Sequence, residues 1–547
     1  MRTIPKQFNL ADYYLFDRIA ENMGARTAIR FGERTYRYDD VADKTLRTVD
    51  VLQTQSLRPG DRVYIVLPDI PPFAWAFFGA LKAGATVAMG NPLSKTEDLL
   101  YVIDYVSPTV VITTDEVAGR LDAHFAGRPD QPKLLVTPNP GTFDDPEAPL
   151  SDPRCLARAL TDANRQPEIK PTDRDTPAIW LFTSGSTGRP KAAMHCHQDF
   201  AFNTEVYAKG TIGYQADDVC VSVPRLFFGY ATGTNLMFPF AVGACAGLFS
   251  EKPTADRIAW AIDYYGATAL TNVPTLMARL LESDAETPLD LSSLRFALSA
   301  GEALPPALLE RWLARFDVPV YDGIGSAEMF HIYLTNRPDD VKPGSLGRPV
   351  DGYELRILPA DAEGPGAAET PVGTNGVLWI KGDSVSTGYW LDREKSWHTF
   401  HGHWCRSGDL FRKDEDGYYW FGGRADHLLK VSGQWVSPLE IEHCLATHPQ
   451  VIEAAVIGVE RDGLMSTRAF VEVRCEPTPV LGNELQDFVR TNLAKYKYPR
   501  EVVFVEALPR NDRGKVDKKA LEDVYETHEL ESRRSNNHRS EPLFEKR

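Results

Sequence analysis

Short runs of β-branched and aromatic residues alternate with longer helix-like stretches through the first two thirds of the chain. We expect the runs to form buried strands and the stretches between them to form helices that cross from one parallel strand to the next. The pattern therefore predicts an α/β fold with parallel sheets, whose strands include residues 62–67, 110–113, 219–223, 269–271 and 296–298.

The pattern changes near Gly352, where strands separated by Gly-rich turns replace the alternation. Segments 376–382 and 416–420 are typical of a small antiparallel barrel or sheet. A further unit begins near residues 423–426 and indicates a compact α+β domain of roughly 100 residues. Its expected elements are a helix from Ser437-Pro438, a strand at 455–459, a helix around 485–493 and a strand at 502–505.

The composition of the 547 residues is that of a globular protein, with 43% hydrophobic and 25% charged residues, which excludes fibrous and wholly disordered chains. Only the stretch 526–547 is polar without periodicity, and it predicts a solvated tail. The 76 acidic residues outnumber the 60 basic ones, so the net charge is −16. This balance argues against a general nucleic-acid or anionic-membrane binder. Any anionic ligand must therefore be held by a local positive site.

Neither a membrane span nor a disulfide framework is expected. The longest apolar stretch, 236–249, is interrupted by proline and glycine and is shorter than the roughly 20 residues that cross a bilayer. The N-terminus shows no apolar signal core. The seven cysteines are scattered and form no Cys-x-x-Cys pair, so we expect reduced core thiols and a cytoplasmic protein.

The most informative segment is an apolar strand that leads into a loop of hydroxyls, glycines and cations. It reads Ile179-Trp180-Leu181-Phe182-Thr183-Ser184-Gly185-Ser186-Thr187-Gly188-Arg189-Pro190-Lys191. Glycines let backbone N–H groups converge, hydroxyls add donors and Lys191 adds charge, a combination that suits polyphosphate oxygens. The segment is not a Walker loop, because Gly-x-x-x-x-Gly-Lys-[Ser/Thr] is absent. Taken alone, the segment is also compatible with an ordinary surface loop rich in serine and glycine.

This segment resembles the phosphate-binding signature of the acyl-adenylate-forming superfamily, which comprises acyl-CoA synthetases, luciferases and the adenylation domains of peptide synthetases. Later motifs follow in that family's order and extend the resemblance over most of the chain. They are the adenine-side loop Ser299-Ala300-Gly301-Glu302-Ala303-Leu304-Pro305, the glutamate segment Tyr321-Asp322-Gly323-Ile324-Gly325-Ser326-Ala327-Glu328, the ribose site Ser407-Gly408-Asp409-Leu410, the hinge Gly423-Arg424-Ala425-Asp426 and the lysine loop Pro509-Arg510-Asn511-Asp512-Arg513-Gly514-Lys515.

The resemblance implies a domain plan and a set of ligands. Residues 1–425 would form a large N-terminal adenylate-forming domain of two parallel-rich sheets with helices and a small β-barrel-like subdomain. Residues 426–525 would form a small mobile α+β domain, followed by the tail at 526–547. The implied ligands are ATP, Mg²⁺, CoA and a carboxylic acid.

The family's roles transfer to the residues that match its motifs. Lys515 is implied as the catalytic cation at the α-phosphate, where charge grows during transfer, with Lys191 adding positive charge from the phosphate loop. Glu328 would hold Mg²⁺, which prefers few protein carboxylates. Asp409 would accept from both ribose hydroxyls and Arg424 would contact ribose or phosphate. The other implied nucleotide contacts are Thr183, Ser184, Gly185, Ser186, Thr187, Gly188, Gly301, Glu302, Ala303, Asp322 and Gly323.

Taken singly, these residues also fit simpler roles. Lys515 could be a surface lysine, Glu328 an N-terminal helix residue, Asp409 a turn residue and Arg424 the partner of an acid. Asp426 matches the hinge about which the family's small domain rotates between two half-reactions, and a linker that only joins domains is its alternative. The same rotation would bring Val431-Ser432-Gly433 to the pantetheine tunnel, with Ser432 and Gly433 beside the thiol arm.

Two segments, 225–230 and 328–338, resemble benzoate and other aryl-acid CoA ligases within the superfamily. The resemblance places Phe228, Gly229, Tyr230, Ile324 and His331 around a flat acyl pocket with one polar tip. Such a slot favours an aromatic acid through ring contacts and apolar burial. An amino acid is disfavoured, because its ammonium would need a buried carboxylate where the chain has Phe228. For His331, a hydrogen-bonded core histidine is the alternative.

Three positions depart from the family pattern. Ala327 stands where the family usually has threonine, which removes a hydroxyl expected near the α-phosphate. Gly229 stands where benzoate enzymes commonly have alanine and opens space for a ring substituent or a larger acid. His427 replaces the usual second aspartate beside the hinge. Elsewhere, His195 and His197 alternate but have no third or fourth metal ligand nearby in the sequence, so no metal is expected there.

Together these motifs predict an ATP- and Mg²⁺-dependent acid:CoA ligase that makes an aryl-CoA by way of an aryl-AMP. One alternative keeps adenylation but loads a carrier-protein phosphopantetheine. Another is a non-catalytic ligand-binding descendant, which the missing hydroxyl at Ala327 leaves open. We expect no nucleic-acid or membrane partner and a monomer or homodimer.

Overall fold

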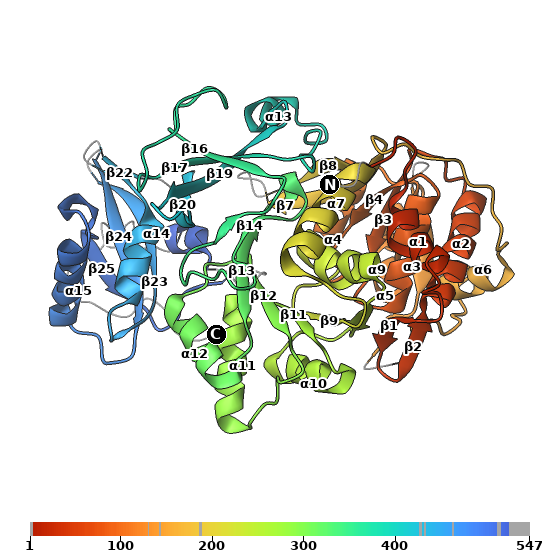
Figure 1. Cartoon of the computed structure of the whole chain (residues 1–547), viewed down its shortest axis with the longest axis horizontal. Helices are drawn as coiled ribbons and strands as arrows, with labels where there is room; N and C mark the ends of the chain where they lie inside the picture. The colour runs from red at the N-terminus through yellow and green to blue at the C-terminus, as the bar shows by residue number, and fades with distance from the viewer. Residues whose placement is uncertain are drawn as a thin grey trace.

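The predicted α/β fold is confirmed by the computed structural model, which describes residues 4–128, 131–141, 144–184, 189–425, 429–431, 434–461, 464–510 and 516–523. A large N-terminal domain holds two mixed sheets and a smaller antiparallel sheet, and a small α+β domain follows it. Figure 1 shows strands β3 and β4 of the first sheet on the right, strands β11 to β13 of the second in the centre, the smaller sheet above and the C-terminal domain on the left.

The first sheet has the strand order β6-β5-β3-β4-β7-β8, and its strands are parallel except for β8. Strands β4 and β5 are buried along their whole length, which is why they read as continuous apolar runs. One face packs against α4 and α5, and the other faces the core shared with α2 and α3. The bounds are β3 Arg62–Val66, β4 Thr86–Met89, β5 Val110–Thr114, β6 Lys133–Thr137, β7 Pro177–Ser184, β8 Pro190–Cys196, α2 Tyr38–Thr54, α3 Pro71–Lys82, α4 Thr96–Val106, α5 Asp115–Phe125 and α6 Leu156–Asp162.

The second sheet has the order β15-β14-β13-β12-β11-β9-β10-β1-β2, with parallel pairs at its centre and antiparallel pairs at both edges. Helices α10, α11 and α12 cover its outer face. Its other face shares a core with the first sheet. The bounds are β1 Thr27–Phe31, β2 Arg34–Arg37, β9 Val219–Ser222, β10 Cys245–Leu248, β11 Ala269–Asn272, β12 Phe296–Ser299, β13 Val320–Gly325, β14 Ile332–Thr335, β15 Arg348–Pro349, α10 Ala255–Tyr265, α11 Pro274–Glu286 and α12 Pro306–Phe316.

Short helical elements pack into the core between the two sheets. They include α7 after the phosphate loop and a 3-10 turn, η4, after β13. The bounds are η1 Asp12–Phe16, α1 Asp17–Ala20, α7 His197–Asn203, η2 Thr204–Ile212, α8 Gly229–Thr232, η3 Gly233–Met237, α9 Phe238–Val242 and η4 Ala327–Met329. In the part of the chain that is described, no helix has the length and apolar character of a membrane span.

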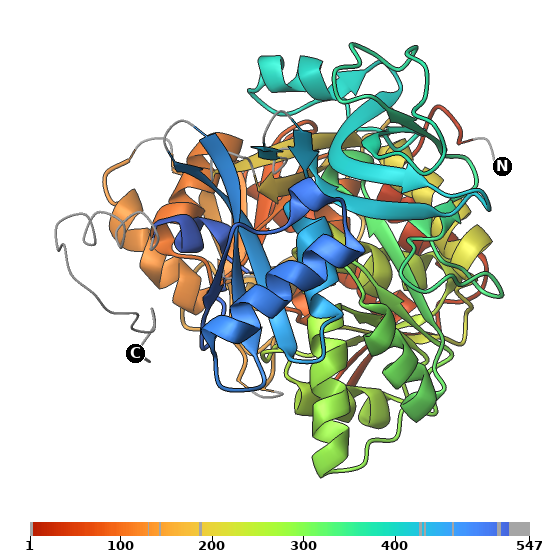
Figure 2. The same ribbon diagram turned by 90° about the vertical axis from the view of Figure 1, so that its left-hand side faces the viewer.

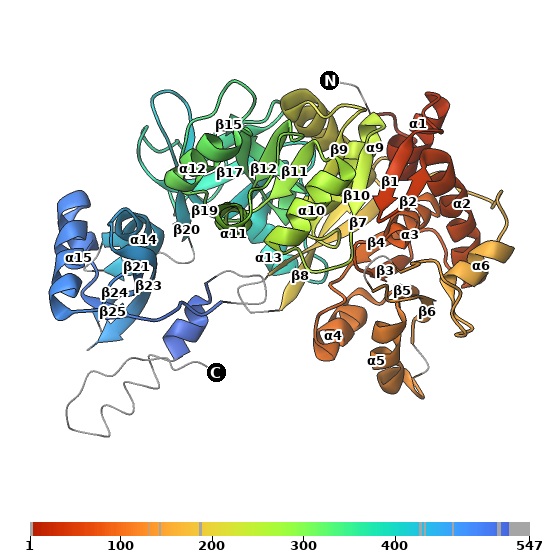
Figure 3. The ribbon, with the colours of Figure 1, turned by 90° about the horizontal axis from the view of Figure 1, so that it is seen from below.

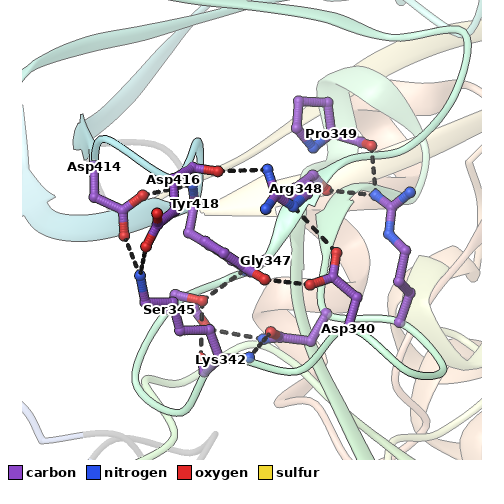
Figure 4. Close-up of polar contacts among 11 residues, drawn as sticks. Asp340, Lys342, Ser345, Gly347, Arg348, Pro349, Asp414, Asp416 and Tyr418 are labelled. Carbon is purple, nitrogen blue, oxygen red and sulfur yellow. Dashed lines mark hydrogen bonds and ion pairs between the residues drawn. The ribbon is translucent and has the colours of Figure 1, made fainter. Parts of the chain in front are cut away.

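The smaller sheet is antiparallel, as predicted, and is tied to the second sheet by a polar network (Figure 4). Nζ of Lys342 lies 2.8 Å from Oδ2 of Asp414 and 2.9 Å from Oδ2 of Asp416, and Arg348 pairs with Asp340. The network fixes the turn between β19 and β20. The expected strand at 416–420 begins only at Tyr419, because Gly417 takes a turn conformation with φ +86°. The bounds are β16 Glu354–Leu358, β17 Gly376–Lys381, α13 Arg393–Thr399, β18 Phe400–His401, β19 Trp404–Lys413 and β20 Tyr419–Arg424.

The C-terminal domain has an antiparallel β23-β24 hairpin, with β25 parallel to β24 and with α14 and α15 packed on the sheet. Figure 2 shows α15 outermost, and Figure 3 shows the domain at one end of the molecule beside β20. Helix α14 begins after Ser437 as predicted, whereas α15 begins earlier than expected, at a proline that suits the first helical turn. The bounds are β21 Leu429–Val431, β22 Gln434–Val436, α14 Pro438–Ala446, β23 Val451–Arg461, β24 Leu464–Val473, α15 Pro479–Asn492, η6 Lys495–Lys497 and β25 Glu501–Phe504.

The cysteines agree with the expectation of reduced thiols, with one correction. All seven are free and six are buried, but Cys475 is exposed. It follows the end of β24 and so lies outside the apolar core. The predicted tail at 526–547 lies outside the described residues.

Candidate active site

The two large sheets meet where the hairpin β7-β8 packs against turn η4. The carboxyl ends of β7, β12 and β13 lead into the motifs singled out from the sequence. In open α/β sheets, ligands bind at the carboxyl ends of strands. The fold therefore collects these motifs at the junction of the two sheets.

The predicted phosphate loop is the tip of the β7-β8 hairpin. Thr183 pairs with Lys191 across it, and the backbone of Ser184 pairs with Pro190. Gly185, Ser186, Thr187 and Gly188 lie outside the described residues. The strand expected before the loop is confirmed as β7, while the return strand β8 had no clear signal in the sequence.

Lys191 lies over an aromatic ring that the sequence analysis missed. Its Nζ is 4.0 Å from the ring centroid of Tyr389. Residues 387–390 run along β8, where Trp390 N donates to Ala192 O at 2.9 Å. Burial lowers the pKa of the Lys191 ammonium, and the negative charge of Glu328 opposes this effect. Lys191 and Glu328 are therefore close enough for their opposite charges to attract each other.

Glu328 lies in turn η4 and receives a hydrogen bond from the same tyrosine. The Tyr389 hydroxyl donates to Oε1 of Glu328 at 2.5 Å. Burial raises the pKa of Tyr389, and the Glu328 charge raises it further, so the hydroxyl keeps its proton and remains a donor. The backbone carbonyl of Glu328 accepts from Ser386 N at 2.8 Å.

Glu328 suits Mg²⁺ as a single carboxylate ligand. The described residues contain no cluster of three or more histidine, cysteine, aspartate or glutamate side chains that could hold a metal. Mg²⁺ in phosphate-transfer sites keeps several waters and uses one or two carboxylates together with substrate phosphates. The donor set at Glu328 therefore fits a magnesium ion that arrives with a nucleotide.

Asp409 and Arg424 face each other on neighbouring strands β19 and β20. Nη1 of Arg424 lies 3.1 Å from Oδ1 of Asp409. Arg424 therefore pairs with an acid, which was the alternative role considered for it. That acid, Asp409, is also the predicted ribose ligand. Buried Tyr333 lies near Asp409 and Glu328, and both charges help raise its pKa.

The predicted adenine-side residues lie on neighbouring strand ends. Gly301 has φ +86°, and the Glu302 carboxylate accepts from the hydroxyl and amide of Thr275 at 2.8 and 3.2 Å. Ala303 follows in the same loop after β12. Asp322, in the glutamate segment on β13, pairs with Ser299 of β12, and Gly323 follows it.

The predicted acyl residues surround a buried aromatic cluster. The His331 ring centroid lies 4.7 Å from that of Phe238 and 5.4 Å from those of Tyr207 and Tyr230. Burial lowers the pKa of His331 to about 3, so the imidazole is neutral at pH 7. Its Nε2 donates to the Tyr230 carbonyl at 3.1 Å, which leaves Nδ1 as an acceptor.

Polar groups without a hydrogen-bonding partner gather beside this cluster. Among the described residues, none bonds Nδ1 of His331, the Tyr230 hydroxyl or Oδ1 of Asp322. Burial raises the pKa of Asp322 to about 8, opposed by the Ser299 hydroxyl and the Gly323 amide. These groups are available to a ligand that brings polar atoms to this cluster.

The other residues predicted to line the acyl pocket border the cluster. Gly229 begins α8, and a methyl group on it would lie 3.3 Å from the Leu181 side chain. Ile324 is half-buried, whereas Phe228 is 38% exposed and packs against Phe227.

Several predicted residues cannot be placed. Lys515, Asp426, Ser432 and Gly433 lie outside the described residues, as does His427. In the described part of the C-terminal domain, Nη2 of Arg510 lies 2.6 Å from Oε2 of Glu453 on β23. Burial raises the pKa of Glu453, and the negative charge of Glu302 in the adenine-side loop adds to this effect.

Four further residues near this site were not predicted from the sequence: Tyr389, Tyr333, Ser384 and Ser386. The hydroxyl-rich run Ser384-Val385-Ser386-Thr387-Gly388-Tyr389 directly after β17 was the one available signal. His195 and His197 have separate partners: the first contacts Asp199 and Ala327, and the second accepts from Leu10 N at 3.1 Å.

Comparisons with known proteins show the family of the chain. The family model described as AMP-binding enzyme matches residues 16–390, and the AMP-binding enzyme C-terminal domain matches residues 440–515. The chain is 37% identical to a benzoate--CoA ligase of Thauera aromatica, over 94% of this chain and 96% of that protein. It is 34% identical to a 4-hydroxybenzoate--CoA/benzoate--CoA ligase of Rhodopseudomonas palustris, over 95% and 94% of the two chains.

Solved structures show the same similarity. A benzoate CoA ligase from Burkholderia xenovorans LB400 superposes with a TM-score of 0.83 at 35% identity, covering 94% of this chain and 99% of that one. An anthranilate CoA ligase in complex with anthranoyl-AMP superposes with a TM-score of 0.86 at 31% identity, covering 96% and 99%.

Proposed function

The chain belongs to the AMP-binding enzyme family, and on that premise we propose that it is an ATP-dependent ligase that joins an aromatic, benzoate-like acid to CoA. The observation that carries this proposal is the similarity to benzoate and hydroxybenzoate CoA ligases over nearly the whole chain. The buried aromatic cluster around His331 supports the aromatic substrate, because ring contacts favour a flat acyl group.

The reaction has two half-reactions. In the first, a carboxylate oxygen attacks the α-phosphorus of ATP, the bond to the bridging oxygen breaks and pyrophosphate leaves. In the second, the CoA thiol loses its proton, its sulfur attacks the acyl carbon, and AMP leaves with the bond electrons. The first step brings two anions together, and at about 4 Å they repel by ~1 kcal/mol in water and several-fold more in a partly dry site.

Cations on this chain offset that repulsion. Lys191 is half-buried beside the phosphate loop. Burial lowers its pKa, the charge of Glu328 raises it and that of Arg424 lowers it. Lys515 is proposed as the second cation, at the α-phosphate. A fixed positive charge that meets growing negative charge stabilises the transition state more than the ground state.

Glu328 is proposed to hold Mg²⁺, oriented by the hydrogen bond from Tyr389. When bound, the ion would neutralise charge on the phosphate oxygens. Asp409 is proposed to accept hydrogen bonds from the ribose hydroxyls, with Arg424 holding its carboxylate in place. Thr183, Ser184 and residues 185–188 would donate to phosphate oxygens, and Gly301, Glu302, Ala303 and Gly323 would border the adenine.

Phe228, Gly229, Tyr230, Ile324 and His331 are proposed to line the acyl pocket. Gly229 leaves room for a ring substituent, and the acceptor Nδ1 of His331 lies near unpaired polar groups of Tyr230 and Asp322. Each buried polar group left unpaired costs about 1–3 kcal/mol. A ring that carries a hydroxyl or amino group would satisfy some of them.

The C-terminal domain is proposed to begin at the hinge Asp426 and to rotate between the half-reactions, with Ser432 and Gly433 beside the pantetheine arm. A carrier protein remains the alternative acceptor. Two further points remain predictions: a monomeric or homodimeric state, and a cytoplasmic location, which the buried free thiols support.

A product assay tests the proposed function. The full-length protein is incubated with ATP, Mg²⁺, CoA and a panel of benzoate, hydroxybenzoates and aminobenzoates, and acyl-CoA is sought by mass spectrometry. We expect an aryl-CoA with AMP and pyrophosphate. Loading of a carrier protein with no acyl-CoA would support the alternative acceptor. Absence of acid-dependent ATP/pyrophosphate exchange across the panel would support a non-catalytic descendant.

A further inference from the structure

A fully buried histidine links the strand that carries Lys191 to the turn that carries Glu328. His195 and Lys191 are four residues apart on β8, so their side chains leave the same face of the strand. His195 is 0% exposed. Its Nε2 lies 2.6 Å from the carbonyl oxygen of Ala327, the residue before Glu328.

Asp199 fixes the orientation of this imidazole. Its Oδ2 lies 2.9 Å from Nδ1 of His195 and also accepts from Cys196 N at 3.0 Å. A carbonyl oxygen can only accept, so Nε2 carries the proton that bonds Ala327, and the hydrogen bond between Nδ1 and Oδ2 takes a second proton, held on Nδ1 or on the Asp199 carboxyl. The histidine therefore acts as a rigid two-ended link between Asp199, on α7, and turn η4.

Turn η4 is held through three successive carbonyl groups. Ala327 O accepts from His195, Glu328 O from Ser386 N at 2.8 Å, and Met329 O from the Ser384 hydroxyl at 2.9 Å. The donors come from β8 and from the segment after β17. The side chain of Ala327 is a methyl group and cannot anchor the turn by itself.

The backbone just after Glu328 is strained. Phe330 has φ +69° and ψ −59°, and His331 N donates to Met329 O at 2.9 Å, which closes a γ-turn in its rare, strained form. Such a conformation persists only where the surroundings fix it. Removing one carbonyl anchor would let the turn relax and would move the Glu328 carboxylate.

We propose that His195, oriented by Asp199, is a positioning residue for adenylation: it fixes the Ala327 carbonyl and thereby orients the Glu328 carboxylate toward the magnesium nucleotide. The proposal rests on the proposed function for the role of Glu328. One face of β8 would therefore carry both Lys191, which supplies positive charge, and His195, which positions Glu328.

Two conservative variants separate the link to Ala327 from general packing. In His195→Gln, the amide nitrogen takes the place of Nε2 and can still donate to Ala327. In His195→Asn, the amide reaches only the position of Nδ1, so the contact with Asp199 is kept and that with Ala327 is lost. His197→Asn is the matched control, because His197 is equally buried and contacts Leu10 instead of η4.

Three measurements are made on the full-length protein, each corrected for the folded fraction. The first is binding of α,β-methylene ATP by calorimetry, with and without Mg²⁺. The second is acid-dependent ATP/pyrophosphate exchange, and the third is thioester formation from synthetic benzoyl-AMP and CoA. For His195→Asn we expect about 10–100-fold weaker Mg²⁺-dependent binding and exchange, the range seen when groups that orient a metal ligand are removed. Thioester formation should be unchanged.

His195→Gln should retain most of the binding and exchange, and His197→Asn should behave like the wild type. Equal losses in His195→Asn and His197→Asn, or an equal loss of thioester formation in His195→Asn, would overturn the positioning role. Should His195→Asn not fold, Asp199→Asn against His195→Gln is the replacement comparison, and failure of Asp199→Asn to alter Mg²⁺-dependent binding would likewise overturn it. Wild-type protein that binds the magnesium nucleotide but activates no aromatic acid would contradict the proposed function alone.

Discussion

The hydroxyl of Tyr389 donates a 2.5 Å hydrogen bond to Oε1 of Glu328. The ring of the same tyrosine lies 4.0 Å from Nζ of Lys191. One side chain thus contacts both the carboxylate proposed to hold Mg²⁺ and a cation proposed to meet the phosphates, and it holds the two in fixed relation.

Tyr389→Phe should weaken the binding of Mg²⁺ during adenylation. The substitution removes the hydrogen bond to Glu328 and keeps the ring under Lys191, so we expect the Mg²⁺ requirement of ATP/pyrophosphate exchange to rise about 10–100-fold. Tyr105→Phe is the control, because its hydroxyl donates to the carbonyl of the adjacent Trp390. Equal effects of the two variants would contradict the role of Tyr389.

Lys515→Ala should slow acyl-AMP formation selectively. Loss of one transition-state donor costs about 10²–10³-fold in rate, so exchange should fall by that factor. Thioester formation from synthetic benzoyl-AMP should continue, because the proposed rotation withdraws this lysine from the site. Exposed Lys519→Ala is the control. An unchanged exchange rate in Lys515→Ala would refute the electrostatic mechanism.

Gly229→Ala should narrow acid specificity. The added methyl group would lie 3.3 Å from a Leu181 methyl carbon and 3.8 Å from the Phe330 carbonyl oxygen, contacts that a leucine side chain can accommodate. We expect kcat/KM for benzoate to change little and that for ring-substituted benzoates to fall roughly 10-fold or more. Equal falls in kcat/KM for benzoate and for the ring-substituted benzoates would show that Gly229 does not face the ring.

Asp322 should give the ligand-free enzyme a pH-dependent stability. Burial raises the pKa of its carboxyl from 3.8 to about 8. Between these values the native state binds more protons than the unfolded chain, so this group makes the free energy of unfolding fall as the pH rises. We expect the Tm of the wild type to fall relative to that of Asp322→Asn from about pH 5 to about pH 9, measured by calorimetry. A constant difference between the two curves would contradict the raised pKa.

Much of the fold could be predicted because its signals are local. Strands β3, β5, β9, β11 and β12 are short buried runs, and burial on both faces makes such runs apolar without alternation. The start of α14 at Ser437-Pro438 follows from the preference of proline for the first helical turn. By contrast, the start of α15 and the start of β20 were misplaced, since element ends depend on tertiary packing.

The sequence by itself determined the class of fold, the family and the motifs that carry charge and hydroxyl groups, because short-range periodicity and ordered motifs are written along the chain. Only the tertiary structure decided which groups meet. Tyr389 and Glu328 are 61 positions apart, and His195 and Ala327 are 132 apart. Their contacts exist because two sheets dock and a segment after β17 adds to the edge of β8, and no local pattern encodes that docking.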